Sequence, residues 1–239
     1  MNHIYETPEE TARAVAELIL AKAKEKTKQS LPFNIALSGG STPKLLFTLL
    51  ANEYVNSVPW HFVRLFWVDE RCVPPTHPES NFGMTYNSLL VHVPIHDSNI
   101  FRMQGEDNPT KEAVRYQKML EKELPLQDGF PQFDLVLLGM GDDGHTASIF
   151  PDNMSLLQSD QAVAVGVHPV SNQERITLTG KTILEAKQVV FLITGAAKAS
   201  VLRQIIKCEP KGESYPTFYV AKNAKSADFY LDQPAASLL

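Results

Sequence analysis

Cysteine is scarce in this chain, and so are long apolar stretches. The 239 residues include two cysteines, Cys72 and Cys208, and no Cys-x-x-Cys pair. A disulfide framework is therefore not expected, and we expect two unpaired thiols in a reducing compartment. A single disulfide between the two cysteines is the alternative. The segment from Met1 to Glu6 has no basic region followed by an apolar run, and no stretch approaches the ~20 apolar residues of a membrane span. We therefore expect a cytoplasmic protein without a membrane partner.

Basic residues are also in short supply. Lys and Arg number 22 against 27 Asp and Glu, which gives a formal net charge of -5. Duplex binding needs a basic surface, so no nucleic-acid partner is expected, whereas a local cluster of cations can still bind a small anion. The length fits a single α/β domain over residues 1–239, because no repeat, linker or clear boundary divides it. The oligomeric state stays open between a monomer and a small homo-oligomer.

The common nucleotide-binding motifs are missing as well. No segment reads Gly-x-x-x-x-Gly-Lys-Ser/Thr or Gly-x-Gly-x-x-Gly, so ATP and NAD are disfavoured and no cofactor is expected. No serine lies in a Gly-x-Ser-x-Gly elbow, which disfavours a serine nucleophile. His92 and His96 are four residues apart, but Pro94 between them argues against a metal-binding helix. We therefore expect no metal site.

The chain does contain short apolar segments that alternate with helical patterns. Fully apolar strands separated by helices are typical of a parallel sheet covered on both faces. We therefore expect an α/β fold with three Rossmann-like layers, in which helices cover both faces of a mostly parallel sheet. The expected strands are residues 33–38, 63–68, 134–138, 189–193 and 218–221, and the expected helices begin after Thr7 and span about 44–50, 112–124 and 197–207.

Four of these strands end in polar or glycine-rich turns, near residues 38, 68, 138 and 195. In open α/β sheets the ligand crevice lies outside the carboxyl ends of the strands, so these turns should meet at one pocket. The first turn, Gly39-Gly40-Ser41-Thr42, leads into a helix whose free N–H groups suit a phosphate. The alternative is a tight turn with a capped helix.

Cations accompany the other turns. Asp69-Glu70-Arg71 follows the second strand, and Arg71 suits bidentate contact with a phosphate or a carboxylate. An internal ion pair of Arg71 with Asp69 or Glu70 is an equally weighted alternative. Arg175 begins an alternating, strand-like run, and Lys198 lies in the first turn of a helix from which it could reach a phosphate. A solvent-facing cation is the alternative for both.

The segment from Gly139 to Ser148 is the most informative part of the chain. His145 follows a strand end and lies beside acids, and a histidine with its reference pKa of ~6.5 is a good general base. Asp143 could orient the ring or favour its charged form. Gly141 and Gly144 could present backbone N–H groups to an oxyanion. A loop histidine that only caps a helix is the alternative.

Taken in order, these motifs resemble the 6-phosphogluconolactonase family over nearly the whole chain. The resemblance implies that family's fold and its reaction, the hydrolysis of 6-phosphogluconolactone to 6-phosphogluconate in the oxidative pentose phosphate pathway. Within the motifs we expect Asp69, Asn81 and Gly144 to contact the substrate. The matching segments are Ser38–Pro43, Trp67–Arg71, Ser80–Met84, Gly139–Pro151, Arg175–Thr179, Thr194–Lys198 and Asp232–Ala236.

Glucosamine-6-phosphate deaminases share that fold, and they also carry the Gly-Gly-Ser-Thr-Pro loop and an Asp-Gly-His. They typically have Asp-Glu-Tyr in place of Asp69-Glu70-Arg71, and Ile-Ala-Phe-Asn-Glu in place of the residues that begin at Thr146. Both departures favour the lactonase, although Gly180-Lys181 after Thr179 departs mildly from the lactonase pattern. The deaminase reaction stays the alternative activity. A non-catalytic sugar-phosphate regulator is the third, since some transcription regulators resemble this fold but carry an added DNA-binding region.

The mechanism expected for a lactonase needs neither metal nor cofactor. Arg71 and Lys198 clamp the phosphate on the glycine-rich loop. Neutral His145, supported by Asp143, takes a proton from the water that attacks C1 and returns it to the ring oxygen. Backbone N–H groups or Arg175 hold the oxyanion. Because a lactone is already reactive, positioning and general base catalysis suffice, and the latter contributes ~100- to 10,000-fold.

Overall fold

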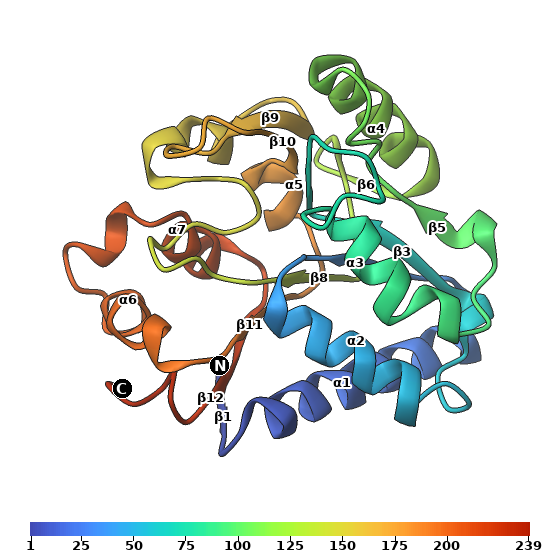
Figure 1. The fold of residues 1–239 in the computed structure, drawn as a ribbon, viewed down its shortest axis with the longest axis horizontal. Helices are drawn as coiled ribbons and strands as arrows, with labels where there is room; N and C mark the ends of the chain where they lie inside the picture. The colour runs from blue at the N-terminus through green and yellow to red at the C-terminus, as the bar shows by residue number, and fades with distance from the viewer.

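The computed structural model describes residues 1–239, and a seven-stranded sheet lies at its centre. The strand order is β1-β12-β11-β8-β2-β3-β5, and every neighbouring pair is parallel (Figure 1). The strands are β1 (Asn2–Tyr5), β12 (Ala227–Asp232), β11 (Val189–Ile193), β8 (Leu135–Leu138), β2 (Phe33–Leu37), β3 (Val63–Trp67) and β5 (Ile100–Phe101).

The central strands are buried on both faces. Every residue of β2, β8 and β11 is buried, which accounts for their nearly continuous apolar sequences. From β2 the chain moves outward through β3 to β5, and from β8 it moves outward the other way through β11 to β12. The order therefore reverses between β2 and β8. Ligand crevices in open α/β sheets form at such a reversal.

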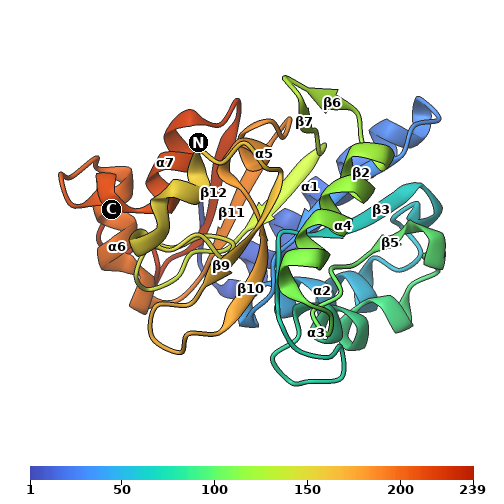
Figure 2. The same ribbon diagram turned by 90° about the horizontal axis from the view of Figure 1, so that it is seen from above.

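Helices cover both faces of the sheet, and each face has its own hydrophobic core (Figures 1 and 2). Phe66 and Trp67 are neighbours in β3 but belong to different cores, because successive side chains of a strand point to opposite faces. One face carries α1 (Pro8–Lys28), α2 (Ser41–Glu53) and α3 (Asn81–Ser88), and the other carries α4 (Pro109–Glu123), α5 (Gly180–Leu184), α6 (Ala199–Ile206) and α7 (Pro216–Asn223). None of these helices has both the length and the apolar character that a bilayer crossing requires.

Two small antiparallel sheets complete the structure. One has the order β4-β10-β9 and the other is the hairpin β6-β7. Their strands are β4 (Asp69–Arg71), β10 (Glu174–Leu178), β9 (Val163–Val167), β6 (Leu126–Gln127) and β7 (Phe130–Pro131). Short 3-10 helices span Trp60–Phe62, Leu90–His92, Asp97–Asn99, Pro151–Leu157, Ala196–Lys198 and Gly212–Ser214.

The predicted fold class is confirmed, but the prediction of the last strand is wrong. Residues 218–221 lie in α7, where Pro216 occupies the first turn, and the last strand is β12. Four consecutive apolar residues do not distinguish a helix from a strand by their periodicity. The edge strand β1 was not predicted, because its four residues are alternately exposed and half-buried. The helix expected from residue 44 already begins at Ser41.

Candidate active site

A cavity of about 250 Å³ lies where β2, β8 and β11 end. Residues from all four predicted turns line it, as the parallel arrangement of the strands requires. Asp143 and Gly144 lie outside its lining. The predicted site residues that do line it are Gly39, Gly40, Ser41, Thr42, Asp69, Arg71, Asn81, His145, Arg175 and Lys198.

The N-terminus of α2 forms one wall of this cavity. Gly40 has φ 108°, a left-handed conformation that favours glycine and turns the chain from β2 into the helix. The backbone N–H groups of residues 39–42 find no acceptor within the chain. The Thr42 hydroxyl shares a hydrogen bond of 2.8 Å with the hydroxyl of Thr194, the residue that follows β11. The wall therefore presents free donors and a helix N-terminus, which together suit an anion.

His145 and Asp143 form a hydrogen-bonded pair. The distance from His145 Nδ1 to Asp143 Oδ1 is 2.6 Å, and the same oxygen accepts the His145 backbone N–H at 3.1 Å. Burial raises the pKa of Asp143, but the bond to His145 and its charge outweigh this and lower the pKa to about 2. Asp143 is therefore an anion that holds Nδ1. The other ring nitrogen, Nε2, has no partner in the chain and remains available to a reactant.

The predicted oxyanion donors in this turn are wrong. Gly141 donates its N–H to the carbonyl oxygen of His145 at 2.9 Å, and Gly144 donates its N–H to the carbonyl oxygen of Gly141 at 3.1 Å. Both N–H groups therefore close the turn and do not face the cavity. Gly144 has φ 79°, and a Cβ there would lie 2.5 Å from the Tyr215 ring. This glycine shapes the turn and does not line the pocket.

Two arginines face each other across the small sheet beside the cavity. Arg71 in β4 pairs in register with Arg175 in β10. The Arg71 guanidinium donates to the backbone carbonyl of Glu79, while its Nε is buried without a partner. Burial lowers the pKa of Arg175, and the charge of Arg71 lowers it further. Two adjacent cations without a carboxylate partner are chemically suited to an anion.

Neither of the internal ion pairs considered for Arg71 forms. Asp69 instead accepts from Ser148 Oγ at 2.7 Å and from Asn81 Nδ2 at 3.2 Å. Glu70 accepts the backbone N–H of Arg71 at 2.8 Å. Ser148 was not singled out from the sequence, because its bond to Asp69 joins segments far apart in the chain and leaves no local signal.

Lys198 also lines the cavity, but it has a partner. Its Nζ pairs with a carboxylate oxygen of Asp142, which lies in the same turn as His145. A ligand phosphate would therefore compete with Asp142 for this ammonium. The side chain nevertheless lies at the wall of the cavity that the α2 N-terminus also lines.

Comparison with known proteins identifies the family of this chain. The chain matches the family described as glucosamine-6-phosphate isomerases/6-phosphogluconolactonase over residues 6–229. The chain belongs to this family. The resemblance seen in the motifs is thereby confirmed, and so is its extent over nearly the whole chain.

Several relatives within this family are named 6-phosphogluconolactonase. A 6-phosphogluconolactonase of Treponema pallidum is 40% identical over 203 residues, which cover 85% of this chain and 83% of that protein. One of Aggregatibacter actinomycetemcomitans is 38% identical over 230 residues, which cover 96% of this chain and 97% of that protein. The solved structure of the Trypanosoma brucei 6-phosphogluconolactonase matches with a TM-score of 0.88 at 31% identity, covering 100% of this chain and 98% of that one. A monomeric glucosamine-6-phosphate deaminase matches with a TM-score of 0.83 at 21% identity and shows the shared fold alone.

Proposed function

We propose that this chain hydrolyses 6-phospho-D-glucono-1,5-lactone to 6-phospho-D-gluconate, the lactonase step of the oxidative pentose phosphate pathway, in the cytoplasm. The observation that supports this most strongly is the Asp143–His145 pair, with His145 lining the same cavity as the free N–H groups of residues 39–42. A general base and an anion site in one cavity suit a phosphorylated ester. The lactonase names of the relatives point to the same reaction.

In the proposed mechanism His145 activates water. Asp143 holds Nδ1, so Nε2 takes a proton from the water that attacks the lactone carbon C1. The C1–O bond to the ring then breaks, and Nε2 returns the proton to the departing ring oxygen. Since the N–H groups of Gly141 and Gly144 are already bonded, we assign the developing oxyanion to Arg175.

The phosphate end of the substrate is assigned to the opposite wall. The N–H groups of residues 39–42 receive the phosphate, with Arg71 and Lys198 as the cations that clamp it. Arg71→Ala should then chiefly raise KM, whereas Arg175→Ala should chiefly lower kcat. The reverse pattern would exchange the roles of the two arginines, and an unchanged KM in Arg71→Ala would remove it from the clamp.

The competing activity is deamination of glucosamine 6-phosphate, which the shared fold leaves open. One pair of assays separates the two. Purified protein is given the lactone, with 6-phosphogluconate formation measured against the spontaneous rate, and separately glucosamine 6-phosphate, with ammonia measured. We expect acceleration of the first reaction only. Ammonia release without lactone hydrolysis would replace the proposal with the deaminase, and neither reaction with retained 6-phosphogluconate binding would favour a non-catalytic regulator.

A further inference from the structure

Glu70 is a buried carboxylate that makes no ion pair. Its residue is 1% exposed, and no Lys, Arg or His nitrogen lies within 4.0 Å of its oxygens. In sequence it lies between Asp69 and Arg71, which line the cavity, but it does not line the cavity itself. Burying an unpaired carboxylate costs free energy unless hydrogen-bond donors surround it. The donors around Glu70 therefore indicate which parts of the chain it holds.

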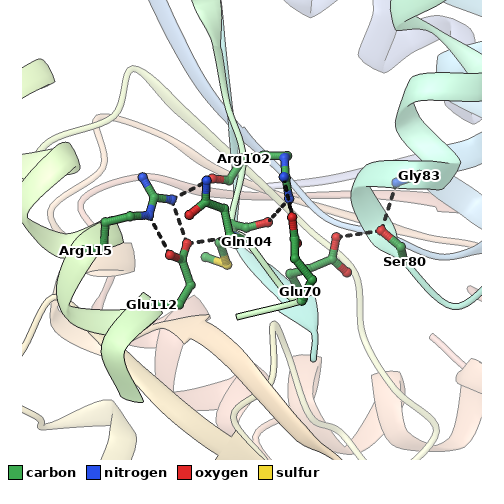
Figure 3. A network of polar contacts seen from close by, with 9 residues as sticks. Glu70, Ser80, Gly83, Arg102, Gln104, Glu112 and Arg115 are labelled. Carbon is green, nitrogen blue, oxygen red and sulfur yellow. Dashed lines mark hydrogen bonds and ion pairs between the residues drawn. The ribbon is translucent and has the colours of Figure 1, made fainter. Parts of the chain in front are cut away.

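Four hydrogen-bond donors surround this carboxylate. Oε1 accepts the backbone N–H groups of Arg71 at 2.8 Å and of Asn81 at 2.7 Å. Oε2 accepts the Ser80 hydroxyl at 3.0 Å (Figure 3). It also accepts the backbone N–H of Phe82 at 2.7 Å. Burial raises the pKa of Glu70, and these four bonds oppose the rise. Each oxygen of Glu70 thus accepts two hydrogen bonds. This matches the two lone pairs that each oxygen of an ionised carboxylate offers.

The two hydrogen bonds to Oε1 come from residues that line the cavity. Arg71 and Asn81 both line it, and they come from β4 and from the first residue of α3. The Asn81 amide donates to the backbone carbonyl of Asp69 at 3.0 Å, and its Oδ1 lies 1.8 Å from where a Cβ on Gly39 would be. Asn81 therefore fills the space between α3 and the loop that would receive the phosphate. Its placement depends on where α3 begins.

We propose that Glu70 is a positioning residue that fixes Arg71 and Asn81 in the cavity by holding β4 and the N-terminus of α3 on one carboxylate. This inference rests on the proposed function, because the effect is read out in lactone hydrolysis. Glu70 touches neither the substrate nor the reacting atoms. It sets the distance between the arginine side of the cavity and the phosphate loop.

The chain supplies a matched control in Glu112. This carboxylate is also 1% exposed and also bonds a backbone N–H, that of Gln104 at 2.8 Å (Figure 3). It differs in pairing with Arg115, and none of these three residues lines the cavity. A purely structural role for a buried carboxylate predicts similar consequences at both positions. A positioning role predicts a change in substrate binding at Glu70 alone.

Two substitutions separate the hydrogen bonds of Glu70 from its charge. In Glu70→Gln the amide oxygen can keep the bonds to Arg71 and Asn81, and the amide nitrogen can donate to the Ser80 hydroxyl. It cannot accept the Phe82 N–H, so this one bond to α3 is lost. In Glu70→Asp the charge stays, but the shorter side chain cannot reach both β4 and α3. Glu70→Ala removes both the charge and the four hydrogen bonds. Misplacement of binding groups by about 1 Å costs up to about 100-fold, so KM should rise about 10- to 100-fold in the Asp and Ala variants. The rise should be smaller in the Gln variant, which keeps the bonds to the two residues that line the cavity.

The experiment measures KM and kcat for 6-phosphogluconolactone, together with the calorimetric Kd of 6-phosphogluconate, on variants shown to be folded by circular dichroism. Glu112→Ala should leave KM and Kd unchanged. The proposal is overturned if KM stays unchanged in the Asp variant, if the Gln variant is as impaired as the Asp variant, or if Glu112→Ala raises KM equally. Should the Ala variant fail to fold, the Gln and Asp pair still decides. An inactive parent protein would refute the proposed function instead, and the Kd values would still test the placement.

Discussion

The substitution Gly141→Ala tests whether catalysis depends on the position of the Asp143–His145 pair. It adds one methyl group and removes no functional group. A Cβ at this position would lie 2.1 Å from His145 Nδ1 and 2.5 Å from Asp143 Oδ1. The first distance is about 1.3 Å short of the 3.4 Å at which ordinary contact begins. The backbone φ of Gly141 is not in the left-handed region, so alanine is tolerated by the main chain itself. The ring, the carboxylate or both must move by about this distance.

Displacing a catalytic group by about 1 Å costs about 100-fold in rate, so Gly141→Ala should lower kcat by about that factor. The assay is 6-phosphogluconate formation at saturating lactone, corrected for the spontaneous reaction. The control is the calorimetric Kd of 6-phosphogluconate on the same variant, because the N–H groups of residues 39–42 lie on another segment of the cavity wall. The reasoning is refuted if Gly141→Ala retains full kcat, or if the variant loses product binding as strongly as it loses kcat.

Two further perturbations test buried and half-buried ionisable groups that do not line the cavity. Burial raises the pKa of Asp134, but Lys26 and Lys187, at 2.6 and 2.9 Å, outweigh it and hold the pKa below its ordinary 3.8. This ionised carboxylate therefore stabilises the fold above that pH, and the stabilisation is lost as pH falls through the lowered pKa. Asp134→Asn should reduce the free energy of unfolding in urea by about 1–3 kcal/mol at neutral pH, with a smaller difference in acid; equal stability at neutral pH would contradict this. Burial also raises the pKa of Cys72 to about 11, while Cys208 is exposed. Iodoacetamide at pH 8 should label Cys208 quickly and Cys72 slowly, as peptide mass spectrometry can show, and equal rates would be the contrary result.

Much of the site could be predicted because parallel strands bring their carboxyl ends to one edge. The turns after β2, β3, β8 and β11 are far apart in sequence, yet each follows a strand and so had to meet the others. The Asp143–His145 pair could also be predicted from the sequence, because its members are only two positions apart in the chain. The geometry of a parallel sheet therefore predicted that the turns meet, and short spacing in the chain predicted the Asp143–His145 pair.

The remaining features depend on contacts that have no local signature. The pairing of Arg71 with Arg175 joins segments about a hundred residues apart, so the absence of an ion pair at Arg71 could not be read from Asp69 and Glu70 beside it. The N–H groups of Gly141 and Gly144 were predicted to be free, but both donate to carbonyl oxygens within the turn. Residues 218–221 were predicted as a strand because a short apolar run has no period long enough to show a helix.

The central claim is that His145 activates water in a site that otherwise binds the sugar phosphate. Its most direct test is His145→Ala, with lactone hydrolysis and calorimetric binding of 6-phosphogluconate measured on the same preparation. We predict that turnover falls by ~100- to 10,000-fold while product binding stays within a few-fold of the parent protein. Near-normal turnover in His145→Ala would contradict the account.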